Sequence, residues 1–109
     1  RKWPFILIDV HTKEGIVGRS YLEPYIEKSC RYISQTISDL ADTLVGKALA
    51  PLDAYRDGMR SLHLVGREGV TLIAISGLDM AIWDALAKAA GMPLATLLGA
   101  STGPVRAYN

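Results

Sequence analysis

The sequence contains one cysteine, Cys30, one phenylalanine and two histidines, and neither sign of charge is in clear excess. A single cysteine excludes an internal disulfide, which fits a reducing environment, and Cys30 is interpreted as a buried apolar thiol. The 12 basic and 11 acidic residues are scattered, so the charge pattern offers no surface for nucleic acid or for an anionic membrane. We therefore expect a cytoplasmic protein with neither kind of partner.

Long hydrophobic runs are also scarce. Residues 3–10 form an apolar stretch that is too short to cross a bilayer, and the longer stretch at 70–90 is interrupted by Asp79, Asp84 and Lys88. Half of the 109 residues are apolar and 21% are charged, which is typical of a folded globular domain. This length allows one hydrophobic core but not an additional, larger domain.

The first residues predict a β-hairpin. Apolar and β-branched residues occupy 5–10 and 16–22, and the polar loop between them, 11–15, ends in Gly15. Two strands alone are marginally stable in water. We therefore expect a third strand, from upstream of Arg1 or from another part of a longer parent chain, to complete a three-stranded meander.

Helical periodicity follows the hairpin. The first helix is predicted to have Pro24 in its first turn and to end before Gly46, with an apolar stripe formed by Ile26, Cys30, Ile33, Ile37, Leu40 and Leu44. The second, closed by Gly66, has a shorter stripe formed by Leu52, Tyr55, Met59 and Leu62. The third is predicted over 68–90 and ends at Gly91. It carries a row of mostly small residues that lets another backbone approach closely: Ile73, Gly77, Ala81, Ala85 and Ala89.

The residue types that usually carry catalysis form no recognisable pattern. His11 falls in the predicted hairpin loop and His63 on the short second helix, so both are interpreted as ordinary surface residues. Asp79 and Asp84 lie about 140° apart around one helix and cannot share a ligand. We expect Asp84 to pair with the residue four positions later, Lys88. Asp79 is expected to hold a neighbouring loop or helix end, and Trp83 to pack in the core.

A polar and aromatic group follows the second predicted strand. Ser20, Tyr21 and Tyr25 lie where loop side chains often face a ligand. Ser20 has no neighbouring base and no Gly-x-Ser-x-Gly context, so a binding role is favoured over a nucleophilic one. From the residues alone, the prediction is an α+β domain with an incomplete sheet.

The segment 74–99, AISGLDMAIWDALAKAAGMPLATLLG, resembles a signature of the mandelate racemase and muconate lactonizing enzyme family of the enolase superfamily. Other parts are similar to the family's amino-terminal domain, including Ile8-Asp9, residues 15–18 and 20–22, and residues 105–108, which would enter a barrel. Within the family, the mandelate racemase type is the most similar. The signature sets seven positions in one register: Asp79, Ala81, Asp84, Lys88, Pro93, Leu97 and Gly99.

The resemblance implies an enolase-type capping domain at 1–104, with its amino-terminal part missing, in which a hairpin precedes a helical bundle. Residues 105–109 would begin the first strand of a catalytic (β/α) barrel that this chain lacks. The implied parent enzyme is a racemase, acid-sugar dehydratase or cycloisomerase that removes a proton α to a carboxylate, with Mg²⁺ bound by the barrel. The family's base motif, metal ligands and His-Asp pair have no matching positions here. No catalytic or metal residue is therefore assigned, and the fragment alone is expected to be inactive.

The resemblance also implies that the loop after the second strand, residues 20–25, covers the substrate pocket and helps to select the substrate. Tyr25 is then the first candidate for substrate binding, followed by Tyr21 and Ser20. The implied partners are a small-molecule carboxylate, the barrel of the same parent chain and further copies in a homo-oligomer. Two alternatives stay open: a stand-alone binding module, and a structural or oligomerisation domain whose small-residue helix face packs against another subunit. An open sheet edge and an exposed third helix would make the isolated fragment weakly stable or self-associating.

Overall fold

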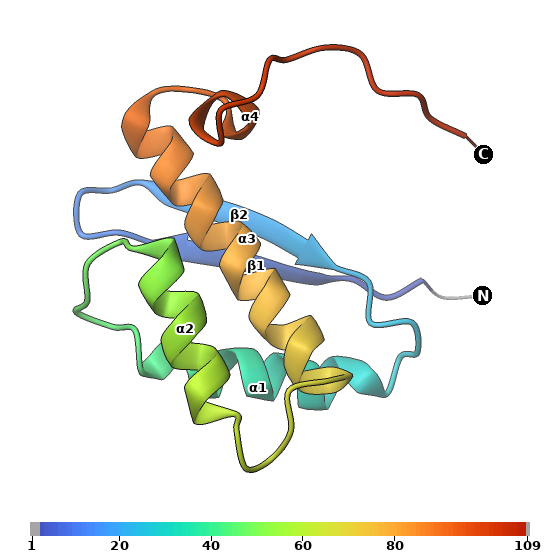
Figure 1. Cartoon of the computed structure of the whole chain (residues 1–109). Coiled ribbons are helices and arrows are strands. Elements are labelled where there is room, and N and C mark those ends of the chain that lie inside the picture. The colour runs from blue at the N-terminus through green and yellow to red at the C-terminus, as the bar shows by residue number, and fades with distance from the viewer. Residues whose placement is uncertain (1–2, 109) are drawn as a thin grey trace.

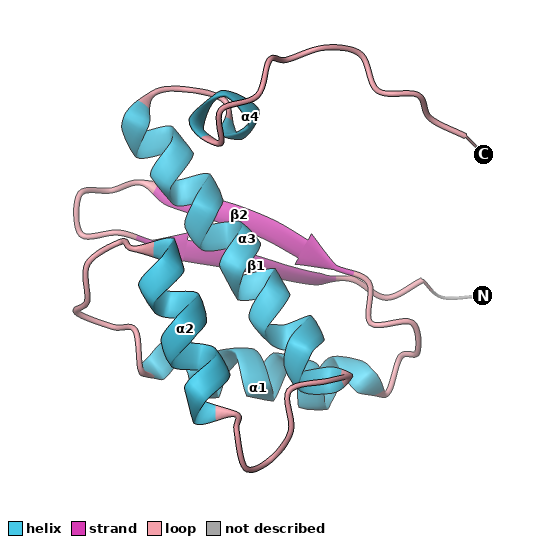
Figure 2. Cartoon of the chain, viewed as in Figure 1, coloured by secondary structure: helices cyan, strands magenta, loops and turns pink. Residues whose placement is uncertain are grey.

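A computed structural model describes residues 3–108, in which a hairpin is followed by four helices (Figure 1). The longest helix, α3, contacts both strands and each of the other helices. Helix α3 crosses one face of the hairpin, and the other helices pack against α3 (Figure 2). This is the predicted α+β arrangement, and the described residues form no barrel. The elements are β1 (Ile6–His11), β2 (Val17–Leu22), α1 (Ser29–Asp42), α2 (Pro51–Ser61), α3 (Val70–Ala90) and α4 (Leu94–Leu97).

The hairpin pairs β1 and β2 in antiparallel register, from Ile6 opposite Leu22 to His11 opposite Val17. The turn is closed by the Thr12 N–H, which donates to the Ile16 carbonyl oxygen at 2.9 Å. The prediction of a hairpin is confirmed, but His11 is the last residue of β1 and not part of the loop. The prediction placed it in the loop because the polar run 11–15 starts there, whereas ladder pairing with Val17 continues the strand.

The hairpin packs against the row of small residues on α3. A Cβ atom on Gly18 of β2 would lie 2.6 Å from the Cβ atom of Ala85 and would also overlap the carbonyl oxygen of Ala81. On the helix side, a Cβ atom on Gly77 would lie 2.5 Å from a methyl group of Leu22. The predicted close approach is therefore confirmed, and its partner is β2 of the same chain. The alternative in which this row packs against another subunit is therefore wrong, because β2 already covers Gly77, Ala81 and Ala85.

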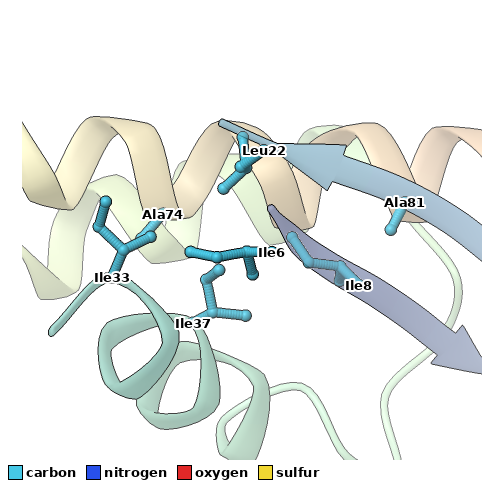
Figure 3. Close-up of a cluster of buried hydrophobic side chains, with 7 residues drawn as sticks. All are labelled: Ile6, Ile8, Leu22, Ile33, Ile37, Ala74 and Ala81. Atoms are coloured by element: carbon cyan, nitrogen blue, oxygen red, sulfur yellow. The ribbon is translucent and has the colours of Figure 1, made fainter. Parts of the chain in front are cut away.

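Two clusters of buried side chains make up the core. The first fills the space between hairpin, α1 and α3 (Figure 3), and consists of Ile6, Ile8, Leu22, Ile33, Ile37, Ala74 and Ala81. Cys30 packs against this cluster but is only partly buried. The second cluster lies between α1, α2 and α3, and consists of Leu40, Leu62, Ile75, Leu78 and Ile82.

Helix α1 begins at Ser29, so the prediction that Pro24 lies in its first turn is wrong. A tight turn centred on Tyr25 separates Pro24 from the helix and leaves Ile26 exposed outside it. Helix α1 also ends at Asp42, four residues before Gly46, and a succession of turns covers the remainder.

The predicted stripe of α2 is wrong at its first two positions, because Leu52 and Tyr55 are exposed. The physical reason is Gly58, where an added Cβ atom would lie 2.6 Å from Ile75 of α3. The two helices come close together at this glycine, and the buried side of α2 includes the residues four positions to either side of it, Ala54 and Leu62.

The carboxyl-terminal part contains the predicted helix end at Gly91, which has a φ of 68°. The expected turn at 93–98 contains the single helical turn α4. Residues 105–108 are exposed and lead away from the domain (Figure 1), and they have no strand partner among the described residues. The expectation that residues 105–109 begin the first strand of a barrel stays a prediction, since the described residues include no barrel with which they could pair; Arg1, Lys2 and Asn109 lie outside the described residues.

Helix α3 has the length and hydropathy that a membrane-crossing helix requires, so its charged residues do not by themselves exclude a span, contrary to the sequence-based argument. The apolar character of α3 is explained by its packing inside the domain. Ala74, Ala81 and Ala85 are completely buried, and the helix contacts all the other elements of the domain. We interpret α3 as the central core helix.

Candidate functional site

Residues 23–28 connect β2 to α1 and carry the first candidate for substrate binding. Pro24 and Leu22 are buried, whereas 76% of the Tyr25 surface is exposed. The connection is therefore anchored in the domain by Leu22 and Pro24, and it exposes the Tyr25 ring to solvent. Tyr25 lies beyond the end of β2, as predicted, but the prediction is wrong for Ser20 and Tyr21, which lie within β2 and not in the loop.

Tyr25 occupies a strained backbone conformation. Its φ of 65° makes it the one non-glycine residue with positive φ in the part of the chain that the structure describes. The Ile26 N–H donates to the Pro24 carbonyl oxygen at 2.7 Å, which closes a three-residue turn around Tyr25. A γ-turn with positive φ at its centre is the rare and strained form. Such a residue costs about 1–3 kcal/mol and persists only where its surroundings hold it.

Ser29, the first residue of α1, supplies such surroundings. Its side chain is buried, with 5% of its surface exposed. Its hydroxyl lies within hydrogen-bond distance of two carbonyl oxygens, those of Pro24 and, at 2.6 Å, Ile26. Its backbone N–H also donates to the Ile26 carbonyl oxygen, at 3.1 Å. Sequence reasoning missed Ser29 because the predicted helix start at Pro24 placed this serine inside the helix, whereas α1 begins at Ser29 and its hydroxyl donates back to the preceding turn.

Tyr21 points away from α3, on the open face of the hairpin. Its ring packs edge-on against Phe5, with centroids 5.9 Å apart and an interplanar angle of 71°. Leu7, directly opposite Tyr21 in the ladder, has 79% of its surface exposed. Tyr21 therefore belongs to an exposed apolar face, which we call the outer hairpin face and define as Phe5, Leu7 and Tyr21.

Ser20 points to the opposite side of β2, because successive strand residues alternate between faces. Its hydroxyl donates to the carbonyl oxygen of Gly77 in α3 at 2.6 Å. The hydroxyl hydrogen is thus used within the fold, and the lone pairs stay available as acceptors. The three candidates for substrate binding consequently do not lie together. Ser20 contacts α3, Tyr21 lies on the outer hairpin face, and Tyr25 lies in the turn between β2 and α1.

Asp84 and Lys88 form the predicted ion pair, with Lys88 Nζ 2.8 Å from Asp84 Oδ2. Both groups also reach β2, which the sequence did not indicate. The Arg19 N–H donates to Asp84 Oδ2 at 2.7 Å, and Lys88 Nζ donates to the Val17 carbonyl oxygen at 2.8 Å. Main-chain groups of alternate residues lie along one edge of a strand, so this pair binds the edge of β2 that faces away from β1. The hydrogen bond from Lys88, followed by that from Arg19, lowers the pKa of Asp84.

Asp79 differs from Asp84 in its surroundings. Partial burial raises the pKa of its carboxyl group, and a hydrogen bond from the side chain of Trp83 opposes that shift. The prediction that Asp79 holds a loop or another helix end is therefore wrong, since its partner lies four residues later on the same helix. Trp83 is only partly buried and belongs to neither core cluster, so the prediction that it packs in the core is not confirmed.

The remaining titratable residues suggest no reaction centre. His11 and His63 are exposed, in agreement with their interpretation as surface residues. Between residues 3 and 108, no three histidine, cysteine, aspartate or glutamate side chains are grouped so that they could hold a metal ion.

A groove of about 940 Å³ lies at the other end of the hairpin from Tyr25. It runs between the hairpin turn, the segment 44–50 and the carboxyl-terminal half of α3, and its walls are mainly apolar. Representative lining residues are Val10, Leu44, Leu49, Leu78, Ile82 and Leu86.

Similar proteins of known structure share this architecture. An enolase from the alpha proteobacterium bal199, with bound magnesium, is 54% identical and superimposes with a TM-score of 0.93 over 97% of this chain and 29% of its own. An enolase from Bradyrhizobium, complexed with magnesium and mandelic acid, is 42% identical, with the same TM-score and coverage. Among curated proteins, L-talarate/galactarate dehydratase from Salmonella typhimurium is 36% identical over 107 residues, which are 95% of this chain and 26% of that protein.

The chain spans about a quarter of the length of the curated relatives that it matches. The family model for the N-terminal domain of mandelate racemase / muconate lactonizing enzyme matches residues 1–99. This match includes the hairpin and all four helices, and the signature segment 74–99 runs from α3 through α4. The chain therefore belongs to the mandelate racemase / muconate lactonizing enzyme family of the enolase superfamily, and its fold is that of the family's N-terminal capping domain.

Proposed function

We propose that this chain is the capping and substrate-selecting domain of a Mg²⁺-dependent enzyme that abstracts a proton α to a carboxylate. The observation that carries the proposal is its close match, over 97% of its length, to a solved structure with bound magnesium and mandelic acid. The parent reaction would be a racemisation, an acid-sugar dehydration or a cycloisomerisation. A small-molecule carboxylate is the proposed substrate, in keeping with the ligand of that structure and with the name of the Salmonella relative.

The described residues do not fit a Mg²⁺ site, because they offer no group of three candidate side chains. We assign the metal to a barrel domain, where it would stabilise the enolate formed from the substrate. Residues 1–104 would form the cap, and residues 105–109 would lead into the barrel's first strand. In this division of roles the cap itself performs no proton transfer.

Tyr25 would form an aromatic wall of the substrate pocket. Its ring is exposed, and its turn is held by hydrogen bonds on both sides, so the ring can exclude water without costly reordering of the loop. Tyr21 and Ser20 are proposed as further contacts to the substrate, after Tyr25. Tyr21 stands on the outer hairpin face, and Ser20 could offer only its acceptor lone pairs.

The selecting role is tested by replacing Tyr25 with alanine in the complete protein and measuring kcat/KM for mandelate and galactarate in Mg²⁺. If Tyr25 lines the pocket, the ratio of the two values changes about tenfold or more, as expected for loss of one aromatic contact in a closed site. His63→Ala, a change at an exposed position in the turn after α2, serves as the control, and the prediction that His63 lies on this helix is wrong. An unchanged ratio would remove Tyr25 from the pocket.

A structural or oligomerisation role is the second candidate, and the outer hairpin face favours it. Phe5, Leu7 and Tyr21 form an apolar group that is exposed on a two-stranded sheet. We propose that any homo-oligomer contact uses this face instead of the covered small-residue row of α3. A cytoplasmic location is retained as part of the proposal.

A further inference from the structure

Ser29 contacts the strained turn from both of its ends. The carbonyl oxygens of Pro24 and Ile26 precede and follow Tyr25, and the Ser29 hydroxyl lies within hydrogen-bond distance of each. A hydroxyl has one hydrogen, so the two acceptors share it or alternate as its partner. The Ser29 N–H gives the Ile26 carbonyl oxygen a second donor. One buried residue of α1 is thereby connected to the peptide group that precedes Tyr25 and to the peptide group that follows Ile26, one on each side of the turn.

This arrangement is not an ordinary helix cap. A capping serine accepts a hydrogen bond from a helical N–H, whereas the Ser29 hydroxyl donates to carbonyl groups that precede the helix. These hydrogen bonds therefore stabilise the Tyr25 turn and not the first turn of α1. Since an unsupported tyrosine avoids positive φ, loss of the hydroxyl would favour relaxation of the turn towards negative φ.

The direction of the Tyr25 ring depends on that backbone conformation. With 76% of its surface exposed, the side chain has little packing to set its direction. Rotation about φ at Tyr25 would move the ring relative to β2 and α3. The backbone turn, and hence the residue that stabilises it, sets where the ring stands.

We propose that Ser29 is a positioning residue that holds the Tyr25 turn in its strained form and so presents the ring to the substrate. The inference rests on the proposed role of Tyr25 in substrate selection. Ser29 itself touches no substrate. It acts through its hydrogen bonds to the carbonyl oxygens of Pro24 and Ile26.

The first experiment measures the turn without reference to activity. The complete protein and its Ser29→Ala variant are digested briefly with chymotrypsin, and the peptide ending at Tyr25 is quantified by mass spectrometry. Loss of one net hydrogen bond should increase opening of the turn, and with it cleavage after Tyr25, by about 3- to 10-fold. Ser61→Ala is the matched control, because the Ser61 hydroxyl donates to the Gly58 carbonyl oxygen on the exposed side of α2. Equal cleavage of the Ser29→Ala variant and the unchanged protein would overturn the proposal.

The second experiment separates positioning from the role of Tyr25 itself. In the same two-substrate assay, Ser29→Ala should change KM in the direction produced by Tyr25→Ala, by a smaller factor and with kcat retained. Ser29→Thr, which restores a hydroxyl, should recover part of the change. If Tyr25→Ala alters selection and Ser29→Ala does not, the positioning inference is overturned while the proposed function stands. If Tyr25→Ala alters nothing but Ser29→Ala still accelerates cleavage after Tyr25, the turn-holding role stands and the selecting role of Tyr25 fails.

Discussion

Gly18 of β2 lies so close to Ala85 of α3 that a Cβ atom added to the glycine would be 2.6 Å from the alanine's Cβ atom. The same added atom would overlap the backbone of α3 at Ala81, which cannot move aside as a flexible side chain would. This pair therefore sets the distance between the hairpin and the core helix.

We expect Gly18→Ala to destabilise the domain by about 2 kcal/mol or more, because overpacking against backbone forces the hairpin away from α3. Urea unfolding followed by tryptophan fluorescence measures the change. Gly103→Ala is the control, since nothing lies within 4 Å of a Cβ atom built on Gly103. A Gly18→Ala protein as stable as the control would mean that the strand does not approach the helix this closely.

Asp84→Asn should weaken the link between α3 and β2 by less than about 1 kcal/mol, because the ion pair with Lys88 is partly exposed to solvent. The folded-state pKa of Asp84 is lowered, so its contribution is present above the usual aspartate value of 3.8 and is lost as the pH falls through the lower, folded value. The variant should therefore lose less stability than the unchanged protein between neutral pH and the acid range. Parallel acid titrations of stability that show the same loss would contradict this expectation.

Asp79 should behave in the opposite sense. Burial raises its folded-state pKa, so its contribution to stability is fully present below the usual value of 3.8 and is lost as the pH rises through the raised value. Asp79→Asn keeps an acceptor for the Trp83 side chain and removes the charge. We expect it to stabilise the domain at pH 7 by a few tenths to about 1 kcal/mol, with no gain at pH 3. Thermal unfolding at both pH values distinguishes this result from a uniform effect.

Tyr25→Gly and Tyr25→Ala both remove the ring, but only glycine adopts positive φ without steric cost. The glycine variant should be more stable than the alanine variant by about 1 kcal/mol. A urea titration of the two variants measures that difference. Equal stability, or a more stable alanine variant, would show that the φ of Tyr25 is negative in solution.

The outer hairpin face should determine whether the domain self-associates. Leu7→Lys places a charge at the most exposed position of this face, where it should suppress association without affecting the core. Sedimentation velocity of both proteins over a range of concentrations provides the comparison. Met80→Lys, a change at an exposed position of α3, is the matched control. If both proteins associate equally, the contact lies elsewhere.

Much of the fold could be predicted because its signals are local or periodic. The hairpin follows from two apolar runs around a polar loop, and the close contact of α3 follows from Gly77, Ala81 and Ala85 on one helix face. The pairing of Asp84 with Lys88 follows from their spacing of four residues. Each of these features depends on residues that are near one another in the sequence.

The remainder depends on tertiary contacts that no local pattern contains. The apolar residues Leu52 and Tyr55 suggested the buried side of α2, but the approach of Gly58 to Ile75 rotates that side away from them. Pro24 suggested a helix start, although the turn at Tyr25 delays it to Ser29. The position of Tyr25 beyond β2 could be predicted, but its strained backbone and its support by a buried hydroxyl could not.

The central claim is that this domain caps an enzyme which forms an enolate from a carboxylate substrate. The most direct measurement is exchange of the α-proton of mandelate, galactarate and L-talarate with deuterium, followed by proton NMR, in the complete protein with Mg²⁺. The account predicts exchange with at least one of these acids, and its loss when a chelator removes the metal. A folded, magnesium-loaded protein that exchanges none of these α-protons would contradict the account and favour a structural role for the domain.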